Sequence, residues 1–338
     1  MRTLTNRRAL VVGLGRSGVS AARFLAARGA KVSATDAKTE ASLGTVPEEL
    51  RVLGVELRLG TPEPGWFLEH DLIIVSPGVP WDLEPLVEAR RQRSEVIGEI
   101  ELAASCLQGR ILGITGANGK TTTTCLAGHL LRGAGLTVQL GGNIGLPYPP
   151  AIDLVESSTP DTWNVLELSS FQLETIGTLR AHIAVALNVT PDHLDRHGSF
   201  ARYAAAKGRL FATQEPGDFA VLNADDPACA GYAALTRGQP VWFSRTRELE
   251  CGASVREGAI VWRRAGTEAV LAEVAAIPLR GAHNLENTLA AVTAAFLAGA
   301  PAEVLRREVA TFRAVEHRLE LVRELGGVAY YNDSKATN

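Results

Sequence analysis

A glycine-rich segment between an apolar strand and a helix constrains the fold of this chain more than any other feature. Residues 113–121 read Gly-Ile-Thr-Gly-Ala-Asn-Gly-Lys-Thr, with a β-rich run at 110–114 before them and a helical pattern over 120–132 after them. A strand, a glycine turn and a helix in this order are typical of a parallel α/β sheet. Such a turn presents backbone N–H groups to an anion at the start of the helix.

The segment also carries the groups that a phosphate-binding loop needs, although one glycine is displaced. Ile114 stands where the strict pattern requires glycine, and Gly113 lies one residue earlier. The remaining positions are in place: Gly116 and Gly119 can cradle phosphate, Lys120 can reach the β- and γ-phosphates, and Thr121 can bind Mg²⁺. The sequence therefore predicts a site for Mg-ATP.

A second glycine loop lies near the N-terminus, at residues 13–18 (Gly-Leu-Gly-Arg-Ser-Gly). It follows a predicted strand over 8–14 and precedes a predicted helix over 17–28, with Ser17 as the N-cap. Asp36 ends the next predicted strand, 31–35. This spacing is the dinucleotide fingerprint, but any diphosphate can bind such a loop. NAD, another diphosphate such as a nucleotide-sugar, and a purely structural turn all remain open.

The 338 residues suggest two domains and the beginning of a third. We predict an α/β fold with a Rossmann-like parallel-sheet domain at 1–98, a central P-loop-type α/β domain at 99–314, and the start of a third, Rossmann-like domain at 315–338. The remaining predicted strands are 71–76, 165–168, 182–188, 219–222 and a pair at 319–324 and 328–331, with short hairpins over 251–278. The remaining predicted helices are 83–93, 283–298 and 305–312.

Composition excludes several classes of protein. A net charge of −3 argues against a nucleic-acid-binding surface. No apolar run is long enough to span a membrane, and the run at 9–12 is too short for a signal peptide, so we expect a cytosolic protein. The cysteines form no CxxC pair, which predicts reduced thiols without zinc or disulfides. They are Cys106, Cys125, Cys229 and Cys251.

Lysine is scarce in this chain. Only five of the 34 basic residues are lysines: Lys31, Lys38, Lys120, Lys207 and Lys335. A chain that uses arginine for its general surface charge is expected to keep lysine where a primary amine is needed.

Several polar residues follow predicted strands or open helices, and each has a functional and a structural interpretation. Glu167 ends an apolar strand, where it could bind Mg²⁺ or be solvated. His193 lies between aspartates and could contact metal or phosphate, or be structural. Lys207 could be a helix-surface lysine. Asn284 and Asn287 could cap a helix or contact a base edge.

The chain resembles the Mur ligase family over essentially its whole length. The loop at 113–121, with its displaced glycine, is similar to that family's phosphate loop. The segments 142–147, 167–174 and 332–338 resemble the D-glutamate-adding branch. The resemblance implies an ATP-dependent acid–D-amino-acid ligase that joins D-glutamate to UDP-N-acetylmuramoyl-L-alanine through an acyl phosphate, in peptidoglycan precursor synthesis. It implies two Mg²⁺ ions and a monomer.

The resemblance also implies residue roles. Catalytic roles fall on Lys120, Glu167, His193 and Lys207. Contacts to ATP fall on Gly116, Asn118, Gly119, Lys120, Thr121, Thr122, Asn284, Asn287, Arg318 and Asp333. Contacts to the UDP-substrate fall on Gly15, Arg16, Ser17, Asp36, Ala37, Gly78 and Asn143, and contacts to D-glutamate on Lys335 and Thr337. The metal ligands would be Thr121, Glu167, His193 and Lys207, the last as a carbamate, which a guanidinium could not form.

Family members carry a third domain that closes over ATP, and here only the short segment 315–338 matches its start. We therefore expect a truncated chain that binds nucleotide and UDP-substrate but ligates poorly or not at all. The alternatives are a sibling Mur ligase or folylpolyglutamate synthetase, a Rossmann NAD-dependent oxidoreductase, and a nucleotide-binding module without activity.

Overall fold

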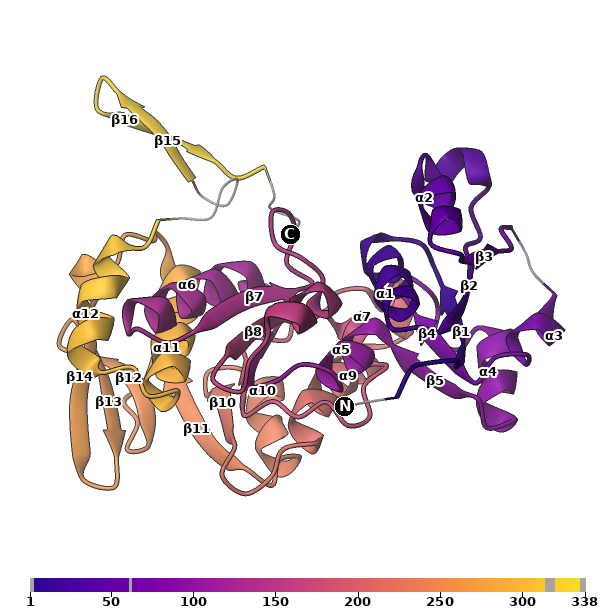
Figure 1. Cartoon of the computed structure of the whole chain (residues 1–338). Helices are drawn as coiled ribbons and strands as arrows, with labels where there is room; N and C mark the ends of the chain where they lie inside the picture. Colours follow the sequence, from indigo (N-terminus) through magenta and orange to yellow (C-terminus); the bar gives the residue numbers. More distant parts are fainter. Residues whose placement is uncertain (1–2, 61–62, 314–319, 335–338) are drawn as a thin grey trace.

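Two α/β units lie side by side in this computed structural model, which describes residues 3–60, 63–313 and 320–334 (Figure 1). The first unit is a parallel sheet in the order β3-β2-β1-β4-β5. Its strands are β1 (Arg8–Val12), β2 (Lys31–Thr35), β3 (Glu56–Leu57), β4 (Leu72–Val75) and β5 (Glu95–Gly98). Its helices are α1 (Arg16–Ala27), α2 (Val46–Val52), α3 (Pro64–Phe67) and α4 (Glu84–Arg91), with a 3₁₀ turn η1 (Glu40–Leu43).

The strand order of the first unit places two loops next to each other. β1 pairs with β2 on one side and with β4 on the other. The chain runs from β1 toward β2 and from β4 toward β5, so these two connections leave in opposite directions along the sheet. A crevice forms at the carboxyl ends of strands at such a switch point, and ligands of α/β proteins bind there. The loop at 13–15 after β1 and the turn at 77–80 after β4 both lie at this edge.

The second unit has a nine-stranded sheet in the order β14-β13-β12-β11-β10-β9-β6-β8-β7. The strands from β7 to β12 in this order are parallel, and β13 and β14 add an antiparallel ribbon. They are β6 (Arg110–Thr115), β7 (Val138–Gly142), β8 (Trp163–Glu167), β9 (Ile183–Ala186), β10 (Phe219–Asn223), β11 (Gln239–Ser244), β12 (Gly252–Arg256), β13 (Ala259–Arg264) and β14 (Thr267–Glu273).

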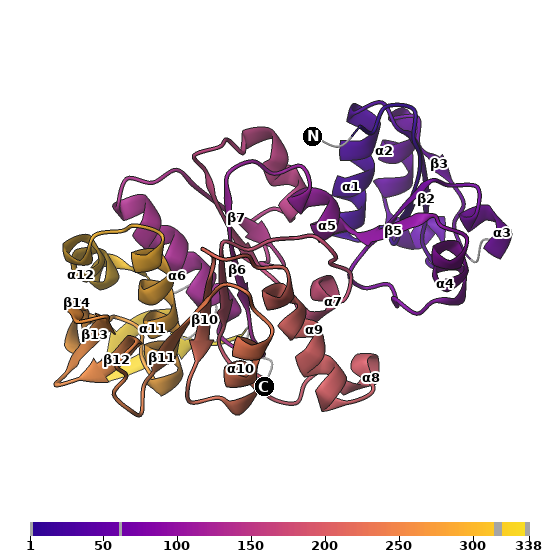
Figure 2. The same cartoon turned by 90° about the horizontal axis from the view of Figure 1, so that it is seen from below.

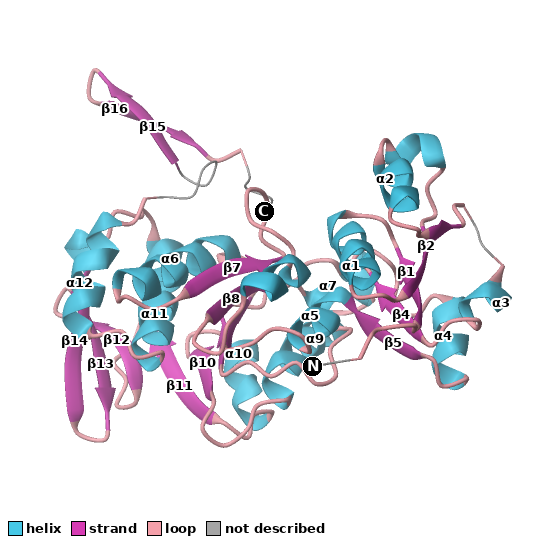
Figure 3. Ribbon diagram, in the orientation of Figure 1, coloured by secondary structure: helices cyan, strands magenta, loops and turns pink. Residues whose placement is uncertain are grey.

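Helices cover both faces of this sheet (Figure 3). Alternate residues of a strand point to opposite faces, so Leu112 and Ile114 of β6 pack under α6 and α11, while Leu166 of β8 packs toward α9. The helices are α5 (Glu99–Ala104), α6 (Lys120–Gly133), α7 (Ser170–Leu173), α8 (Leu194–His197), α9 (Phe200–Ala212), α10 (Pro227–Gly231), α11 (Ala282–Leu297) and α12 (Ala302–Thr311). The 3₁₀ turns are η2 (Ala151–Ser157), η3 (Tyr232–Ala234) and η4 (Val274–Ala276).

The two units share one apolar core. A single cluster of buried side chains runs from α1 through α5 and η2 to α9. Polar contacts reinforce the junction, because Ser20 Oγ of α1 donates to Asp153 of η2 at 2.9 Å and a guanidinium nitrogen of Arg16 donates to the carbonyl of Tyr148 at 2.7 Å. Figure 2 shows the junction from below, with α1 and α5 next to each other.

Beyond α12, the described residues form an antiparallel pair, β15 (Glu320–Leu325) and β16 (Val328–Asn332), that projects away from the second unit in Figure 1. This confirms the predicted strand pair; whether it begins a third domain stays a prediction.

The predicted α/β class is confirmed, and most predicted elements fall within a few residues of the observed ones. One local prediction was wrong: α1 begins at Arg16 with Gly15 as its N-cap, so Ser17 does not cap it. All four cysteines are free, and three of them are buried. No helix in the described part of the chain is both long and apolar enough to cross a bilayer.

Candidate active site

The loop between β6 and α6 takes the shape of a phosphate cradle. Gly119, the N-cap of α6, has φ of +83°, which residues other than glycine rarely adopt. A Cβ atom at this position would lie 2.1 Å from Oδ1 of Asn287, so the loop and α11 are in close approach. The loop therefore requires glycine here for two separate reasons, backbone conformation and space.

An asparagine after β9 holds the loop from the side. Asn188 accepts a hydrogen bond from the Asn118 N–H on its Oδ1 at 2.8 Å, and its backbone carbonyl accepts one from Ala117 at 2.9 Å. Its Nδ2 donates to the Asn118 carbonyl at 3.2 Å. The sequence analysis gave Asn188 no role, and its place directly after an apolar strand was the signal that could have found it.

Two lysines converge on one carbonyl of the loop. Lys120 Nζ donates to the carbonyls of Gly116 at 3.0 Å and Ala117 at 2.8 Å. Lys207 Nζ, from α9, donates to the same Gly116 carbonyl at 2.8 Å. Lys207 is only 1% exposed, so its interpretation as a helix-surface lysine was wrong. The two lysines lie beside the same turn although 87 positions separate them in the sequence.

Burial changes the acidity of Lys207. Desolvation, followed by the charge of Lys120, lowers the pKa of the Lys207 amine to about 7, and the carboxylates of Asp192 and Glu167 oppose this shift only in part. A substantial fraction of the amine is therefore neutral near pH 7. The Tyr203 ring lies beneath it, with Nζ 4.6 Å from the ring centroid.

Glu167 forms a small oxygen-rich cluster with the first residues of α6. Its Oε2 accepts a hydrogen bond from the Thr121 hydroxyl at 2.8 Å, and its Oε1 accepts one from Asn143 Nδ2 at 3.0 Å. The carboxyl is 3% exposed, so the alternative of a solvated strand end was wrong. Thr122, the next residue of α6, is buried.

Hydroxyl and carboxylate oxygens are the donors that Mg²⁺ prefers, and one or two protein ligands with substrate phosphates are its usual set. Thr121 and Glu167 fit that requirement. The described residues contain no group of three or more histidine, cysteine or acidic side chains able to hold a metal by themselves.

His193 lies near this centre but on a more open surface. It has φ of +50° and starts the short helix α8, and its side chain is half exposed. Its ring packs against Phe171 at 4.8 Å between centroids and lies 6.5 Å from the ring of Tyr203, which also contacts Lys207 and His197. Nε2 lies 3.5 Å from a carboxylate oxygen of Asp192.

Asn284 and Asn287 lie on the other side of the loop, at the start of α11. Both are buried, and Asn287 Nδ2 donates to Asn284 Oδ1 at 3.0 Å. Gly281 caps this helix without any side-chain hydrogen bond, so the interpretation of these asparagines as caps was wrong. Asn284 Nδ2 instead donates to the Arg280 carbonyl at 2.7 Å.

The N-terminal loop forms a separate site at the switch point of the first sheet. A Cβ at Gly18 would lie 1.8 Å from the Gly13 carbonyl, so only glycine permits this close packing. Asp36 braces the loop, since its two oxygens accept hydrogen bonds from the N–H groups of Leu14 at 2.6 Å and Lys38 at 2.8 Å. Gly15, Arg16, Ala37 and Gly78 are exposed around it, and Ser17 is half-buried.

The structure thus gathers most of the predicted ATP and metal residues around the β6–α6 loop, and the predicted UDP-substrate residues other than Asn143 around the β1–α1 loop. Asn143, after β7, is exposed and bound to Glu167. Asp333 is exposed after β16. Arg318, Lys335 and Thr337 lie outside the described residues.

Comparison with known proteins shows the family to which the chain belongs. The family model described as the Mur ligase middle domain matches residues 114–295, and the model for the MurD-like N-terminal domain of Mur ligases matches residues 7–98. The chain belongs to the Mur ligase family, whose members are ATP-dependent ligases of peptidoglycan synthesis.

Its sequence relatives include the UDP-N-acetylmuramoylalanine--D-glutamate ligase of Solibacter usitatus, which is 56% identical over 98% of this chain and 72% of the relative. The protein of the same name from Acidobacterium capsulatum is 53% identical over 99% of this chain and 72% of the relative.

Solved structures with the same fold include two other ligases. A UDP-N-acetylmuramate:L-alanyl-γ-D-glutamyl-meso-diaminopimelate ligase of Neisseria meningitides has a TM-score of 0.62 at 18% identity, over 92% of this chain and all of that one. The UDP-N-acetylmuramate-alanine ligase of Thermotoga maritima has a TM-score of 0.55 at 19% identity, over 97% of this chain and 74% of that one. At these identities the likeness supports the fold alone.

Proposed function

We propose that this chain is an ATP-dependent ligase that adds D-glutamate to UDP-N-acetylmuramoyl-L-alanine. The observation that carries the proposal is the phosphate loop held between Lys207 and the Glu167–Thr121 pair, which puts an amine, a carboxylate and a hydroxyl around one glycine turn. Relatives with that activity in their name, at 56% and 53% identity, support the choice of substrates.

The chemistry begins with phosphoryl transfer. The carboxylate of the UDP-substrate attacks the γ-phosphorus of ATP and releases ADP, which leaves an acyl phosphate. The amine of D-glutamate then attacks the acyl carbon, and inorganic phosphate departs as the amide forms. Negative charge builds up on phosphate oxygens in the first step, and the ammonium of Lys120 with the N–H groups of the loop would stabilise it.

Mg²⁺ would supply positive charge to the phosphate oxygens when it is bound. Thr121 and Glu167 are the residues proposed to hold the first ion, and His193 with Lys207 the second. The Asn143 amide orients Glu167 through its 3.0 Å hydrogen bond, so it would keep the carboxylate directed at the loop.

Lys207 is proposed to carry a carbamate. Only a neutral amine reacts with CO₂, and burial lowers the pKa of Lys207 to about 7, which makes the neutral form available. The carbamate would convert a buried cation into an anion with two oxygens. That change would remove the repulsion between Lys207 and Lys120 and add an oxygen ligand beside the loop.

The UDP-substrate would bind at the loop of residues 13–18, with its diphosphate at the start of α1 and with Asp36, Ala37 and Gly78 around it. Asn143 would face the sugar-peptide part. Asn284, Asn287, Arg318 and Asp333 are proposed for the nucleoside side of ATP, and Lys335 and Thr337 for D-glutamate. We expect a cytoplasmic monomer.

The proposal is tested by the identity of the amide product, because even a slow ligase reveals its substrates. The 338-residue chain is incubated at high concentration with Mg-ATP, bicarbonate, UDP-N-acetylmuramoyl-L-alanine and one amino acid at a time. The products are identified by mass spectrometry. We expect a product with D-glutamate that Lys120→Ala does not make. Preference for another amino acid, or no amide with any, would overturn the proposal.

The rate answers a separate question from the identity of the product. Sequence analysis predicts that this chain ligates poorly or not at all, and rapid D-glutamate-dependent ADP release would contradict that prediction while supporting the ligase. Binding of NADH, with no amide product, would favour the oxidoreductase alternative.

A further inference from the structure

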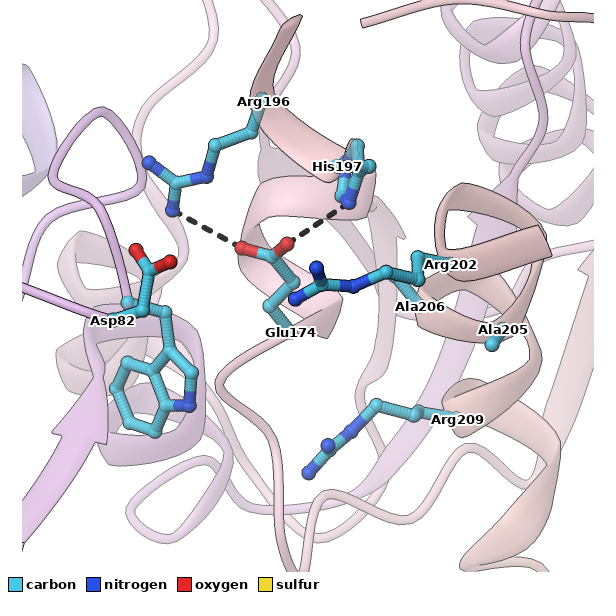
Figure 4. Close-up of a pocket in the computed structure, with 9 residues that line it drawn as sticks. Asp82, Glu174, Arg196, His197, Arg202, Ala205, Ala206 and Arg209 are labelled. Carbon is cyan, nitrogen blue, oxygen red and sulfur yellow. Dashed lines mark hydrogen bonds and ion pairs between the residues drawn. The ribbon is translucent and has the colours of Figure 1, made fainter. Parts of the chain in front are cut away.

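A cavity of about 350 Å³ lies between the first unit and the helices α8 and α9. Trp81 and Asp82, in the loop after β4, form one wall. The other wall comes from the second unit and consists of Glu174, Arg196, His197, Arg202, Ala205, Ala206 and Arg209 (Figure 4). None of the residues that we assign to ATP, metal or UDP-substrate lines it.

Part of the charge in this cavity is already neutralised. Glu174 accepts a hydrogen bond from Arg196 at 3.0 Å, and its other oxygen lies 2.9 Å from Nδ1 of His197. Arg196 also donates to the carbonyl of Val79 at 2.8 Å, across the junction of the units. Burial lowers the pKa of His197, and the neighbouring Glu174 carboxylate opposes this shift in part. Glu174 and Arg196 therefore cancel each other.

Two arginines remain with unused donors. Arg202 and Arg209 lie seven positions apart on α9, which places them two turns apart on one face. The Arg202 guanidinium has no hydrogen bond or ion pair among the described residues. Arg209 donates to the Ile176 carbonyl, and within the described residues its other N–H groups have no partner and can bind a ligand. In Figure 4 both guanidinium groups extend over the cavity.

The residues between and opposite these arginines leave room for a ligand. Ala205 and Ala206 occupy the same face of α9 between Arg202 and Arg209, so only methyl groups stand there. Asp82 lies on the facing wall and makes no hydrogen bond or ion pair within the described parts of the chain. The cavity therefore offers two guanidinium forks on one side and one free carboxylate on the other.

We propose that this cavity binds a small organic phosphomonoester, with its phosphoryl group on Arg202 and Arg209 and a hydroxyl or amino group donating to Asp82. Guanidinium matches phosphate oxygens in paired hydrogen bonds, and a dianion neutralises two arginines. The volume corresponds to roughly ten water molecules, more than phosphate alone would fill. A small carbon skeleton can lie along Ala205 and Ala206.

This site differs from the phosphate loop, because Lys207 points from another face of α9 to Gly116. Its walls come from both units, so a bound ligand would connect the loop after β4 to α9.

The test measures binding of glycerol 3-phosphate and of inorganic phosphate by calorimetry at low ionic strength. Lys120→Ala serves as the background, because the phosphate loop would itself bind both probes. We expect glycerol 3-phosphate to bind the Lys120→Ala chain more tightly than phosphate does. Addition of Arg202→Gln should weaken both at least tenfold, and Arg209→Gln should act in the same direction.

Arg202→Gln is the decisive variant, since Arg202 has no partner in the described structure whose loss would disturb folding. Arg307→Gln, at an exposed position of α12, is the matched control and should leave binding unchanged. Asp82→Asn should reduce the advantage of glycerol 3-phosphate over phosphate. The proposal is overturned if the Lys120→Ala chain binds neither probe, or if Arg202→Gln binds like its parent. Equal affinity for the two probes, insensitive to Asp82→Asn, would rule out the organic ligand.

Discussion

Lys207 Nζ lies 2.8 Å from the carbonyl oxygen of Gly116, and this contact ties α9 to the turn that precedes α6. The amine is buried, and its pKa is lowered to about 7 chiefly by desolvation and then by the charge of Lys120. A neutral amine is a nucleophile toward CO₂, whereas an ammonium is not. The geometry therefore connects the rarity of lysine in the sequence to a chemical requirement at one position.

We predict that activity depends on bicarbonate through Lys207. Removal of CO₂ should reduce amide formation by at least tenfold, and added bicarbonate should restore it. Lys207→Arg should be inactive at every bicarbonate concentration, because a guanidinium forms no carbamate. Lys31→Arg, at an exposed position of β2, is the control. Amide formation by wild type that is indifferent to bicarbonate would contradict the carbamate.

We predict that Gly119→Ala weakens nucleotide binding far more than it destabilises the fold. The new Cβ would lie 2.1 Å from Asn287 Oδ1, so the loop or α11 must move. Gly135→Ala is the matched control, since Gly135 has a similar φ of +78° with nothing near its Cβ position. Both variants should lose about 1–2 kcal/mol of unfolding free energy from left-handed backbone strain, and Gly119→Ala should lose somewhat more because of the contact with Asn287. Only Gly119→Ala should raise the Kd for ATP, by about tenfold or more, and equal affinities of the two variants would count against a loop shaped for phosphate.

We predict that Glu167→Gln raises the Mg²⁺ concentration needed for half-maximal ATP binding at least tenfold. Glutamine keeps the size of the side chain and an acceptor for Thr121, but it removes the charge that attracts the cation. Circular dichroism should show an intact fold, and Glu303→Gln on the exposed face of α12 should behave as wild type. An unchanged Mg²⁺ dependence in Glu167→Gln would exclude Glu167 as a ligand.

Glu99 predicts a pH dependence of stability. It opens α5 at the junction of the units, with Oε1 accepting from the Ile152 N–H at 2.9 Å and Oε2 without a hydrogen-bond partner among the described residues. Burial, opposed by that hydrogen bond and helped by Asp153, raises its pKa from 4.5 to about 7. Between pH 4.5 and about pH 7, the Glu99 carboxyl is protonated in the folded chain and ionised in the unfolded chain. The free energy of unfolding therefore falls as the pH rises through this range.

The side chain of the Glu99→Gln variant cannot titrate. When the pH rises from 5 to 8, wild type should therefore lose about 3 kcal/mol more unfolding free energy than Glu99→Gln does. Chemical denaturation at the two pH values measures the difference. Asp161→Asn, at an exposed position, is the control. Parallel pH profiles for wild type and Glu99→Gln would show that the carboxyl is ionised in the fold.

Local sequence signals predicted the elements around the two glycine loops well. The strand at 31–35 and the helix beginning at Lys120 appear where the pattern placed them, because apolar runs and glycine turns act over a few residues. β7 and β11 were not predicted. β7 contains the pair Gly141-Gly142, which ends its apolar pattern, and β11 begins Gln239-Pro240, where proline counts against a strand although the apolar run Val-Trp-Phe follows.

Contacts between distant residues could not be predicted from pattern alone. The burial of Lys207 depends on α9 packing beneath the β6–α6 loop, and the clamp by Asn188 depends on β9 pairing with β6. The bridge from Arg196 to Val79 depends on how the two units meet. Each of these is set by tertiary packing, which no window of sequence contains.

Binding of Mg-ATP to the loop at Lys120 is the central claim, and calorimetry with a non-hydrolysable ATP analogue tests it most directly. Wild type and the Lys31→Ala control should bind with the same affinity in the presence of Mg²⁺. Lys120→Ala should bind about 10- to 100-fold more weakly, since a charge-assisted contact to phosphate contributes about 1.5–3 kcal/mol. Equal affinity in Lys120→Ala, or binding of NADH in place of the ATP analogue, would contradict the account.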